Sequence, residues 1–292
     1  MTPLSAWVEG ARPRTLPAAV APVLAGSAVA WFEGGFAPLL AGACLVVSLA
    51  LQVGVNYAND YSDGIRGTDA ERVGPLRLVG SGTATPAAVK GAAFGCFGVA
   101  AVAGLAIVVS TGFWGLLLVG LAAILAAWFY TGGRNPYGYQ GWGEVFVFVF
   151  FGLVAVGGTT YVQLGRVTPA SWWAAVAIGC LACSILVANN LRDLAGDRLV
   201  GKRTLATRLG DAGTRRFYVA LNALALASMV GVALTSSWWA LLALASAALL
   251  IAPTRAVLGG ESGRGLIVVL KATGLAELLC SVGLFLGLVI AG

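Results

Sequence analysis

Long apolar stretches recur along the whole chain of 292 residues, and this feature restricts the possible folds more than any other. A helix needs about 20 mostly apolar residues to cross a bilayer core about 30 Å thick. We read nine stretches of this kind, with only short polar segments between them, so the chain is predicted to form one domain, residues 1–292. The predicted spans are 16–33, 36–58, 88–110, 112–130, 143–163, 170–192, 216–235, 237–253 and 266–290.

The composition agrees with a chain that lies in lipid. Hydrophobic residues make up 59% of the sequence and charged residues only 10%, whereas soluble domains carry about 25% charged residues. In a bilayer every backbone amide must be satisfied within the protein, and apolar stretches of this length favour helices over a barrel. We therefore predict an all-α integral membrane protein in contact with the lipid bilayer, and we expect no nucleic-acid partner.

The positive charges predict which helix ends face the cytoplasm, because lysine and arginine are retained preferentially in cytoplasmic loops. With a cytoplasmic N-terminus, Arg166 falls outside and the remaining 17 of the 18 lysines and arginines (18 − 1) fall on the cytoplasmic side. An odd number of spans then places the C-terminus outside. The chain is predicted to be a multi-pass protein of the cell membrane, with any site among these charges facing the cytoplasm.

Two polar clusters occur where predicted spans reach the cytoplasmic side. The first cluster contains Gln52, Asn56, Asn59, Asp60, Asp63 and, six residues farther on, Asp69. The second cluster contains Asn189, Asn190, Asp193 and Asp197. Within each cluster several members are spaced by three or four residues, which places them on one face of a helix. A polar stripe is therefore predicted to run into the membrane at each of these helix ends.

The carboxylates of the two clusters are predicted to share one cavity and to hold Mg²⁺. Like charges at low dielectric favour protonation unless a hard cation with oxygen ligands neutralises them. The predicted metal ligands are Asp60, Asp63, Asp69, Asp193 and Asp197. Neighbouring cations suited to a diphosphate are Arg66, Arg72, Arg77, Arg192, Arg198, Lys202 and Arg203. Simple helix capping would explain one aspartate at each helix end, but it leaves the repeated stripe unexplained.

The two clusters resemble the aspartate-rich motifs of the UbiA-type intramembrane prenyltransferases, which have nine transmembrane helices. Further motifs are similar to those of the members that prenylate 1,4-dihydroxy-2-naphthoate in menaquinone biosynthesis. These motifs are Ala11-Arg-Pro-Arg-Thr-Leu-Pro17, Asn56-Tyr-Ala-Asn-Asp-Tyr61, Tyr130-Thr-Gly-Gly133, Gly141-Trp-Gly-Glu144 and Gly201-Lys-Arg-Thr-Leu-Ala206. One departure is the spacing of Asp63 and Asp69, six residues instead of the four found in many members.

The resemblance implies a transfer of a polyprenyl group from its diphosphate to 1,4-dihydroxy-2-naphthoate, with loss of diphosphate and carbon dioxide to form demethylmenaquinol or demethylmenaquinone. Mg²⁺ is the implied cofactor. The implied catalytic residues are Asn56, Asp60, Asp63, Asp193, Asp197 and Glu144. The implied substrate-binding residues are Arg12, Arg14, Asn59, Arg66, Arg72, Arg77, Tyr130, Arg134, Asn189, Asn190, Lys202 and Arg203, among which Arg12, Arg14 and Arg134 are candidates for the acceptor carboxylate. Residues 72–82 resemble the loop that covers the active site in this family.

Other functions are compatible with the same polar residues. A membrane cation transporter also uses carboxylates within the bilayer, although it typically places them near the midplane with broken helices. Carboxylates gathered at one face beside arginines suit an anionic diphosphate better. Within the enzyme class, the acceptor could also be 4-hydroxybenzoate, homogentisate or haem, and phosphoribosyl transfer onto a lipid phosphate is a further alternative.

Overall fold

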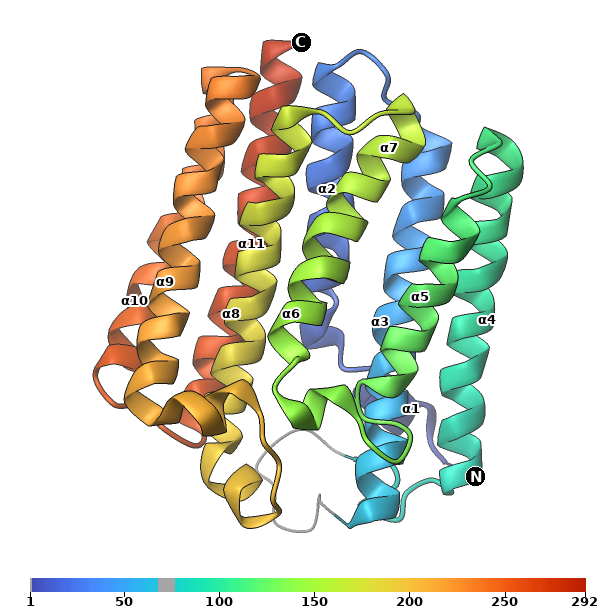
Figure 1. Cartoon of the computed structure of the whole chain (residues 1–292), viewed down its shortest axis with the longest axis vertical. Coiled ribbons are helices and arrows are strands. Elements are labelled where there is room, and N and C mark those ends of the chain that lie inside the picture. The colour runs from blue at the N-terminus through green and yellow to red at the C-terminus, as the bar shows by residue number, and fades with distance from the viewer. Residues whose placement is uncertain (1, 68–76) are drawn as a thin grey trace.

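The computed structural model describes residues 2–67 and 77–292, and the regular secondary structure of these residues is entirely helical (Figure 1). The N-terminal part consists of α1 (Leu4–Gly10), η1 (Pro13–Thr15), α2 (Pro17–Phe32), α3 (Pro38–Arg66), α4 (Pro86–Thr111), α5 (Leu116–Phe129) and η2 (Tyr137–Gln140). The remaining elements are α6 (Gly143–Val147), the π-helical η3 (Phe148–Gly157), α7 (Gly158–Leu164), α8 (Pro169–Leu199), α9 (Leu205–Thr235), η4 (Trp238–Ser246), α10 (Ala247–Leu258) and α11 (Gly265–Ala291).

Local sequence explains where several helices begin. Proline occupies the first position of α2, α3, α4 and α8, where its missing N–H would have no partner in the helix. Before α8, the side chain of Thr168 accepts from the N–H of Ser171, and the hydroxyl of Ser171 accepts from the N–H of Thr168 at 2.9 Å. The predicted spans that start at 36, 88 and 170 therefore begin within two residues of the observed helices.

The predicted spans are helical over most of their length. Seven helical segments of the described chain are long and apolar enough to cross a membrane, and an eighth is obtained if Leu4–Thr15 and Pro17–Phe32 form one span bent by 49°. α5 is also apolar but has only 14 residues. The structure thus confirms an all-helical protein with several membrane spans, whereas nine crossings and the orientation of the termini remain predictions.

The helices pack into two groups. One buried apolar cluster joins α2, η3, α8, α9, η4, α10 and α11, and a second joins α1, α3, α4 and α5. The C-terminal ends of α3 and α8 lie at the same end of the bundle as the N-terminus, and the C-terminus lies at the opposite end (Figure 1). The two polar clusters of the sequence are carried by these two helix ends, so the fold brings them to one level.

Candidate active site

A cavity of about 1250 Å³ is lined by helices of both packed groups. Its charged part is lined by Arg12, Arg14, Asn59, Asp63, Arg77, Asn189, Arg192, Asp193, Asp197 and Lys202. Its apolar part is lined by Val47, Leu51, Leu105, Val108, Leu121, Phe150, Val154 and other side chains of α3, α4, α5 and η3. The cavity therefore joins a charged region at the helix ends to an apolar space between the helices.

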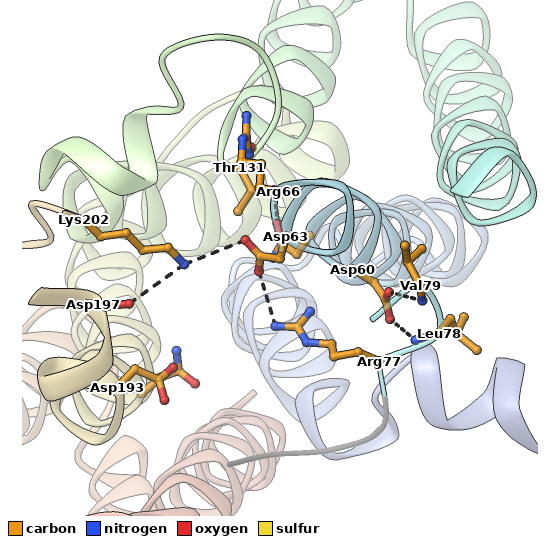
Figure 2. Close-up of polar contacts among 12 residues, drawn as sticks. Asp60, Asp63, Arg66, Arg77, Leu78, Val79, Thr131, Asp193, Asp197 and Lys202 are labelled. Atoms are coloured by element: carbon orange, nitrogen blue, oxygen red, sulfur yellow. Dashed lines mark hydrogen bonds and ion pairs between the residues drawn. The ribbon is translucent and has the colours of Figure 1, made fainter. Parts of the chain in front are cut away.

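Asp63, near the C-terminal end of α3, faces the charged part of the cavity (Figure 2). Its Oδ2 lies 3.4 Å from Nη2 of Arg77, and its Oδ1 lies 3.8 Å from Nζ of Lys202. The hydroxyl of Tyr139 also donates a hydrogen bond to Oδ1. Asp63 is buried, so the two cations and the hydroxyl take the place of the water that a carboxylate otherwise requires.

Lys202 connects the two acidic helix ends. Its Nζ lies 3.9 Å from Oδ1 of Asp197 on α8, in addition to its contact with Asp63 on α3, and it stands 4.3 Å from the centre of the Tyr139 ring (Figure 2). The backbone sets this position: the N–H of Lys202 donates to the carbonyl of Asp197 at 2.9 Å, and the N–H of Arg203 donates to the carbonyl of Tyr139 at 2.8 Å. The turn after α8 is thereby attached to η2.

The acidic end of α8 carries its own counter-ion. Arg192, whose side chain is buried, donates from Nε and Nη2 to the two oxygens of Asp193 at 2.7 and 2.8 Å. Nη2 also donates to Oδ1 of Asn189 at 2.8 Å. Bidentate arginine–carboxylate pairs are among the stronger polar contacts in proteins, so this pair fixes the direction in which the Asp193 carboxylate points.

Two amide side chains that line the cavity are held by neighbouring side chains. Thr131 donates to Oδ1 of Asn59 at 2.8 Å, which leaves the NH₂ group of Asn59 as the donor that this side chain offers. Asn190 donates to Oε1 of Glu144 at 2.9 Å, while Oε2 of Glu144 is buried without a hydrogen-bond partner among the described residues. Glu144 therefore contacts a residue that lines the cavity, although it does not line the cavity itself.

The segment that precedes α2 is fastened to α3 by the first polar stripe. Asn56 donates to the carbonyl of Ala11 at 2.9 Å and to the hydroxyl of Thr15 at 3.0 Å, and Gln52 donates to the same hydroxyl at 3.1 Å. Between these anchors, Arg12 has a φ of 53°. A positive φ is costly for a residue with a side chain, and the surrounding hydrogen bonds hold Arg12 in it, at the cavity.

The structure gathers many, but not all, of the sequence-predicted residues at the cavity. Those that line it are Arg12, Arg14, Gln52, Asn56, Asn59, Asp63, Arg77, Tyr130, Asn189, Asn190, Arg192, Asp193, Asp197 and Lys202. Those that do not line it are Asp60, Arg66, Arg134, Glu144, Arg198 and Arg203. Asp69 and Arg72 lie outside the described residues, as do residues 72–76 of the predicted covering loop.

Arg66, Arg134 and Arg203, which do not line the cavity, are exposed. The guanidinium of Arg66 donates to the backbone carbonyls of Thr131 and Gly133 and so holds the segment after α5. Asp60 is completely buried and turns away from the cavity towards the backbone of Leu78 and Val79 (Figure 2). That these residues contact substrate or metal stays a prediction, and among the described residues Arg66 and Asp60 form hydrogen bonds with backbone carbonyls and amides.

Tyr139 and Thr131 belong to the site but were not among the predicted site residues, although Thr131 lies in the quoted motif Tyr130-Thr-Gly-Gly133. Tyrosine is common near membrane interfaces, and neither residue has a periodic spacing that would distinguish it. Burial raises the pKa of Tyr139, and the negative charge of Asp63 raises it further, so the hydroxyl stays protonated at neutral pH. Tyr139 is therefore a hydrogen-bond donor to Asp63 at neutral pH.

The donor set suits a hard divalent cation that is shared with a substrate. Within residues 2–67 and 77–292, no three acidic or cysteine side chains gather closely enough to enclose a metal ion. Mg²⁺, however, is commonly held by one or two carboxylates together with water and substrate phosphates. The carboxylates of Asp63 and Asp197, from two helices, lie 3.8 and 3.9 Å from the ammonium group of Lys202. The space between these carboxylates therefore already holds one positive charge. The residues present therefore fit Mg²⁺ bound together with a diphosphate.

Known proteins resemble this chain over almost its whole length. It is 51% identical over 281 residues to the 1,4-dihydroxy-2-naphthoate octaprenyltransferase of Mycobacterium tuberculosis, which covers 95% of this chain and 94% of the relative. Its fold matches a UbiA homolog from Aeropyrum pernix K1 with a TM-score of 0.71 at 14% identity, covering 94% of this chain and 97% of that chain. It also matches a UbiA homolog from Archaeoglobus fulgidus bound to GPP and Mg²⁺, with a TM-score of 0.67 at 16% identity, covering 97% and 99%.

At these low identities the two solved structures establish the fold alone. The family model and the relative at 51% identity establish more, because both extend over most of the chain. The model of the UbiA prenyltransferase family matches residues 19–289, which include both acidic helix ends and the cavity-lining helices other than α1 and η1. The chain therefore belongs to the UbiA prenyltransferase family.

Proposed function

We propose that this protein transfers a polyprenyl group from its diphosphate to 1,4-dihydroxy-2-naphthoate, releasing diphosphate and carbon dioxide. The observation that carries the proposal is the single cavity that joins Asp63, Asp193, Asp197 and their neighbouring cations to an apolar space between α3, α4, α5 and η3. Such a cavity suits a ligand with an anionic head and a long apolar tail. The name of the M. tuberculosis relative supports the naphthoate as acceptor.

The charged part is the proposed site of the diphosphate. Arg77 and Lys202 stand beside Asp63 and can direct N–H groups at phosphate oxygens, and Asn59 offers its NH₂ group from the same wall. Mg²⁺, held by Asp63 on one side and by Asp193 and Asp197 on the other, would neutralise the charge that grows on the departing diphosphate. The A. fulgidus homolog was solved with GPP and Mg²⁺, which supports this combination of ligands.

Aromatic side chains of the cavity suit the prenyl carbon, which becomes electron-poor when the diphosphate departs. Tyr130, Tyr137 and Phe146 line the cavity, and the rings of Tyr137 and Phe146 stack with their centres 4.0 Å apart. Aromatic faces attract positive charge, and a wall of rings also keeps water from the reactive carbon. Breakage of the carbon–oxygen bond is therefore proposed to take place beside these side chains.

The acceptor is proposed to approach from the side of η1. Arg12 and Arg14 line the cavity there and can pair with the acceptor carboxylate, whereas Arg134 does not line it. In the proposed step, the carboxyl-bearing ring carbon forms a bond to the prenyl carbon, and the bond to the carboxyl group then breaks. The electron pair of that bond restores the aromatic ring, carbon dioxide leaves, and no net proton is needed.

The proposed location is the cell membrane, with the charged end of the bundle at the cytoplasm. Arg166 lies at the loop before α8, where it pairs with Glu33 at 2.9 Å, and the predicted orientation places this loop outside. The acceptor is an anionic, water-soluble molecule. A site at the cytoplasmic end lets it enter from water while the prenyl chain enters from lipid.

The test is a transfer assay with purified protein in lipid nanodiscs. Farnesyl, geranylgeranyl and octaprenyl diphosphates are each supplied with Mg²⁺ and one of three acceptors: 1,4-dihydroxy-2-naphthoate, 4-hydroxybenzoate or homogentisate. Mass spectrometry is expected to detect a decarboxylated, prenylated naphthoquinol, and none after chelation of Mg²⁺ or in the Asp193→Asn variant. Prenylation of another acceptor, with the naphthoate left unchanged by all donors, would refute the acceptor assignment.

A further inference from the structure

The carboxylate of Asp60 makes different contacts from that of Asp63, although the two residues lie one helical turn apart on α3. Its Oδ2 accepts from the backbone N–H of Leu78 at 2.8 Å and its Oδ1 accepts from that of Val79 at 2.9 Å. The side chain is completely buried and does not line the cavity. Figure 2 shows its carboxylate directed at this backbone, while that of Asp63 is directed at Arg77 and Lys202.

The backbone that Asp60 holds fits closely against its surroundings. Leu78 is completely buried, and a Cβ added at Gly10 of α1 would come within 2.7 Å of its side chain. On the other side, a Cβ added at Gly64 of α3 would come within 2.5 Å of Cβ of Val79. The carbonyl of Leu78 also accepts from the N–H of Ala84 at 2.9 Å. Residues 77–79 are therefore closely packed on both sides, and each oxygen of Asp60 accepts one hydrogen bond from their backbone.

Arg77 precedes this anchored pair directly, and its guanidinium reaches into the cavity beside Asp63. The position of its Cα is set by the two amides that follow it. We propose that Asp60 is a positioning residue, which holds Arg77 at the diphosphate site by binding the backbone of residues 78 and 79, and that it does not bind metal. This inference rests on the proposed function in taking the ligand of Arg77 to be a diphosphate.

The first test needs no substrate. Hydrogen exchange of the full-length protein in nanodiscs is measured for Asp60→Asn and Asp63→Asn. An amide side chain can accept with only one of its two heavy atoms, so Asp60→Asn is expected to speed exchange at residues 78 and 79 by about tenfold or more. Asp63→Asn is expected to leave that exchange unchanged, and α8 serves as the control for folding. Unchanged protection at residues 78 and 79 in Asp60→Asn would refute the anchoring role.

The second test separates positioning from metal binding. Asp60→Asn is expected to raise the KM for prenyl diphosphate about tenfold at an unchanged half-saturating Mg²⁺ concentration, and to add little in an Arg77→Ala background. Asp63→Asn is expected to raise the Mg²⁺ requirement. Gly64→Ala, which displaces Val79 without removing a carboxylate, is expected to reproduce the KM effect. A Mg²⁺ requirement raised by Asp60→Asn as much as by Asp63→Asn would overturn the proposal.

The two kinds of failure are distinguishable. If the wild-type protein transfers no prenyl group, the proposed function fails, while the exchange measurement still decides whether Asp60 anchors this backbone. If transfer is observed and Asp60→Asn changes neither KM nor exchange, the positioning role fails and the proposed function stands.

Discussion

Lys202 is the residue on which the charge balance of the site depends most directly. Its ammonium lies 3.8 Å from Asp63 and 3.9 Å from Asp197, so it lowers the repulsion between carboxylates on α3 and α8. Lys202→Met keeps much of the aliphatic chain and removes the charge. We expect the kcat/KM for prenyl diphosphate to fall about tenfold or more, because the proposed charged hydrogen bond from Lys202 to a phosphate oxygen would contribute about 1.5–3 kcal/mol.

Arg216→Met is the matched control for this prediction, because Arg216 is an exposed cation near the start of α9 and does not line the cavity. Its kcat/KM is expected to stay within about twofold of the wild type. Steady-state kinetics at saturating acceptor measure both variants. Equal losses in the two variants would show that general positive charge at this end, and not the contact of Lys202 with the carboxylates, supports activity.

At the scale of elements, the contact between η3 and α8 depends on two glycines. A Cβ added at Gly152 would lie 2.6 Å from the carbonyl oxygen of Ala175 and 2.8 Å from Cα of Gly179. Backbone atoms cannot move aside as a flexible side chain can, so Gly152→Ala is expected to destabilise the protein by about 1–3 kcal/mol. The expected result is a lower melting temperature in detergent.

Gly157 provides the control on the same helix, because a Cβ added there meets no atom within 4 Å. Gly157→Ala is expected to leave the melting temperature unchanged or slightly higher, since alanine has the better helix propensity. The two alanine variants differ only in position. A similar decrease in both would mean that glycine is needed along η3 for its backbone conformation and not for contact with α8.

The elements also show what periodicity predicts well and what it misses. Apolar runs located each long helix, and prolines such as Pro169 mark several of their starts. The polar ends were missed: α3 and α8 continue past the predicted ends at 58 and 192 to Arg66 and Leu199, and α9 begins at Leu205 and not at 216. The π-helical geometry of η3 and the 3₁₀ turn η2 were not predicted, because both differ from an α-helix only in which carbonyl each N–H reaches. Such shifts depend on packing against neighbouring helices.

For the whole molecule, the predicted orientation is testable through two exposed arginines. Arg166, before α8, is predicted to face the outside, and Arg203, after α8, is predicted to face the cytoplasm. Single Arg166→Cys and Arg203→Cys variants are treated with a membrane-impermeant maleimide in intact cells. We expect labelling of Arg166→Cys in intact cells and of Arg203→Cys only after permeabilisation.

The wild-type chain is the blank for this experiment, because its five cysteines all lie within helices and three of them are buried. Both variants labelled in intact cells, or the reverse order of labelling, would refute a cytoplasmic active site. Because α8 lies between the two positions, labelling from opposite sides also verifies that this helix crosses the membrane.

The sequence by itself determined that the chain is helical, that it lies in a membrane, and that polar residues gather at the ends of two helices. These properties follow from hydrophobicity and helical period, which are local. Asp60 and Asp63 are separated by about 60° around α3, so the same stripe contains both. Tertiary structure alone decided that Asp63 meets Lys202 and Arg77 while Asp60 meets the backbone of Leu78 and Val79. The partners come from segments far along the chain, and helical period carries no information about where those segments pack.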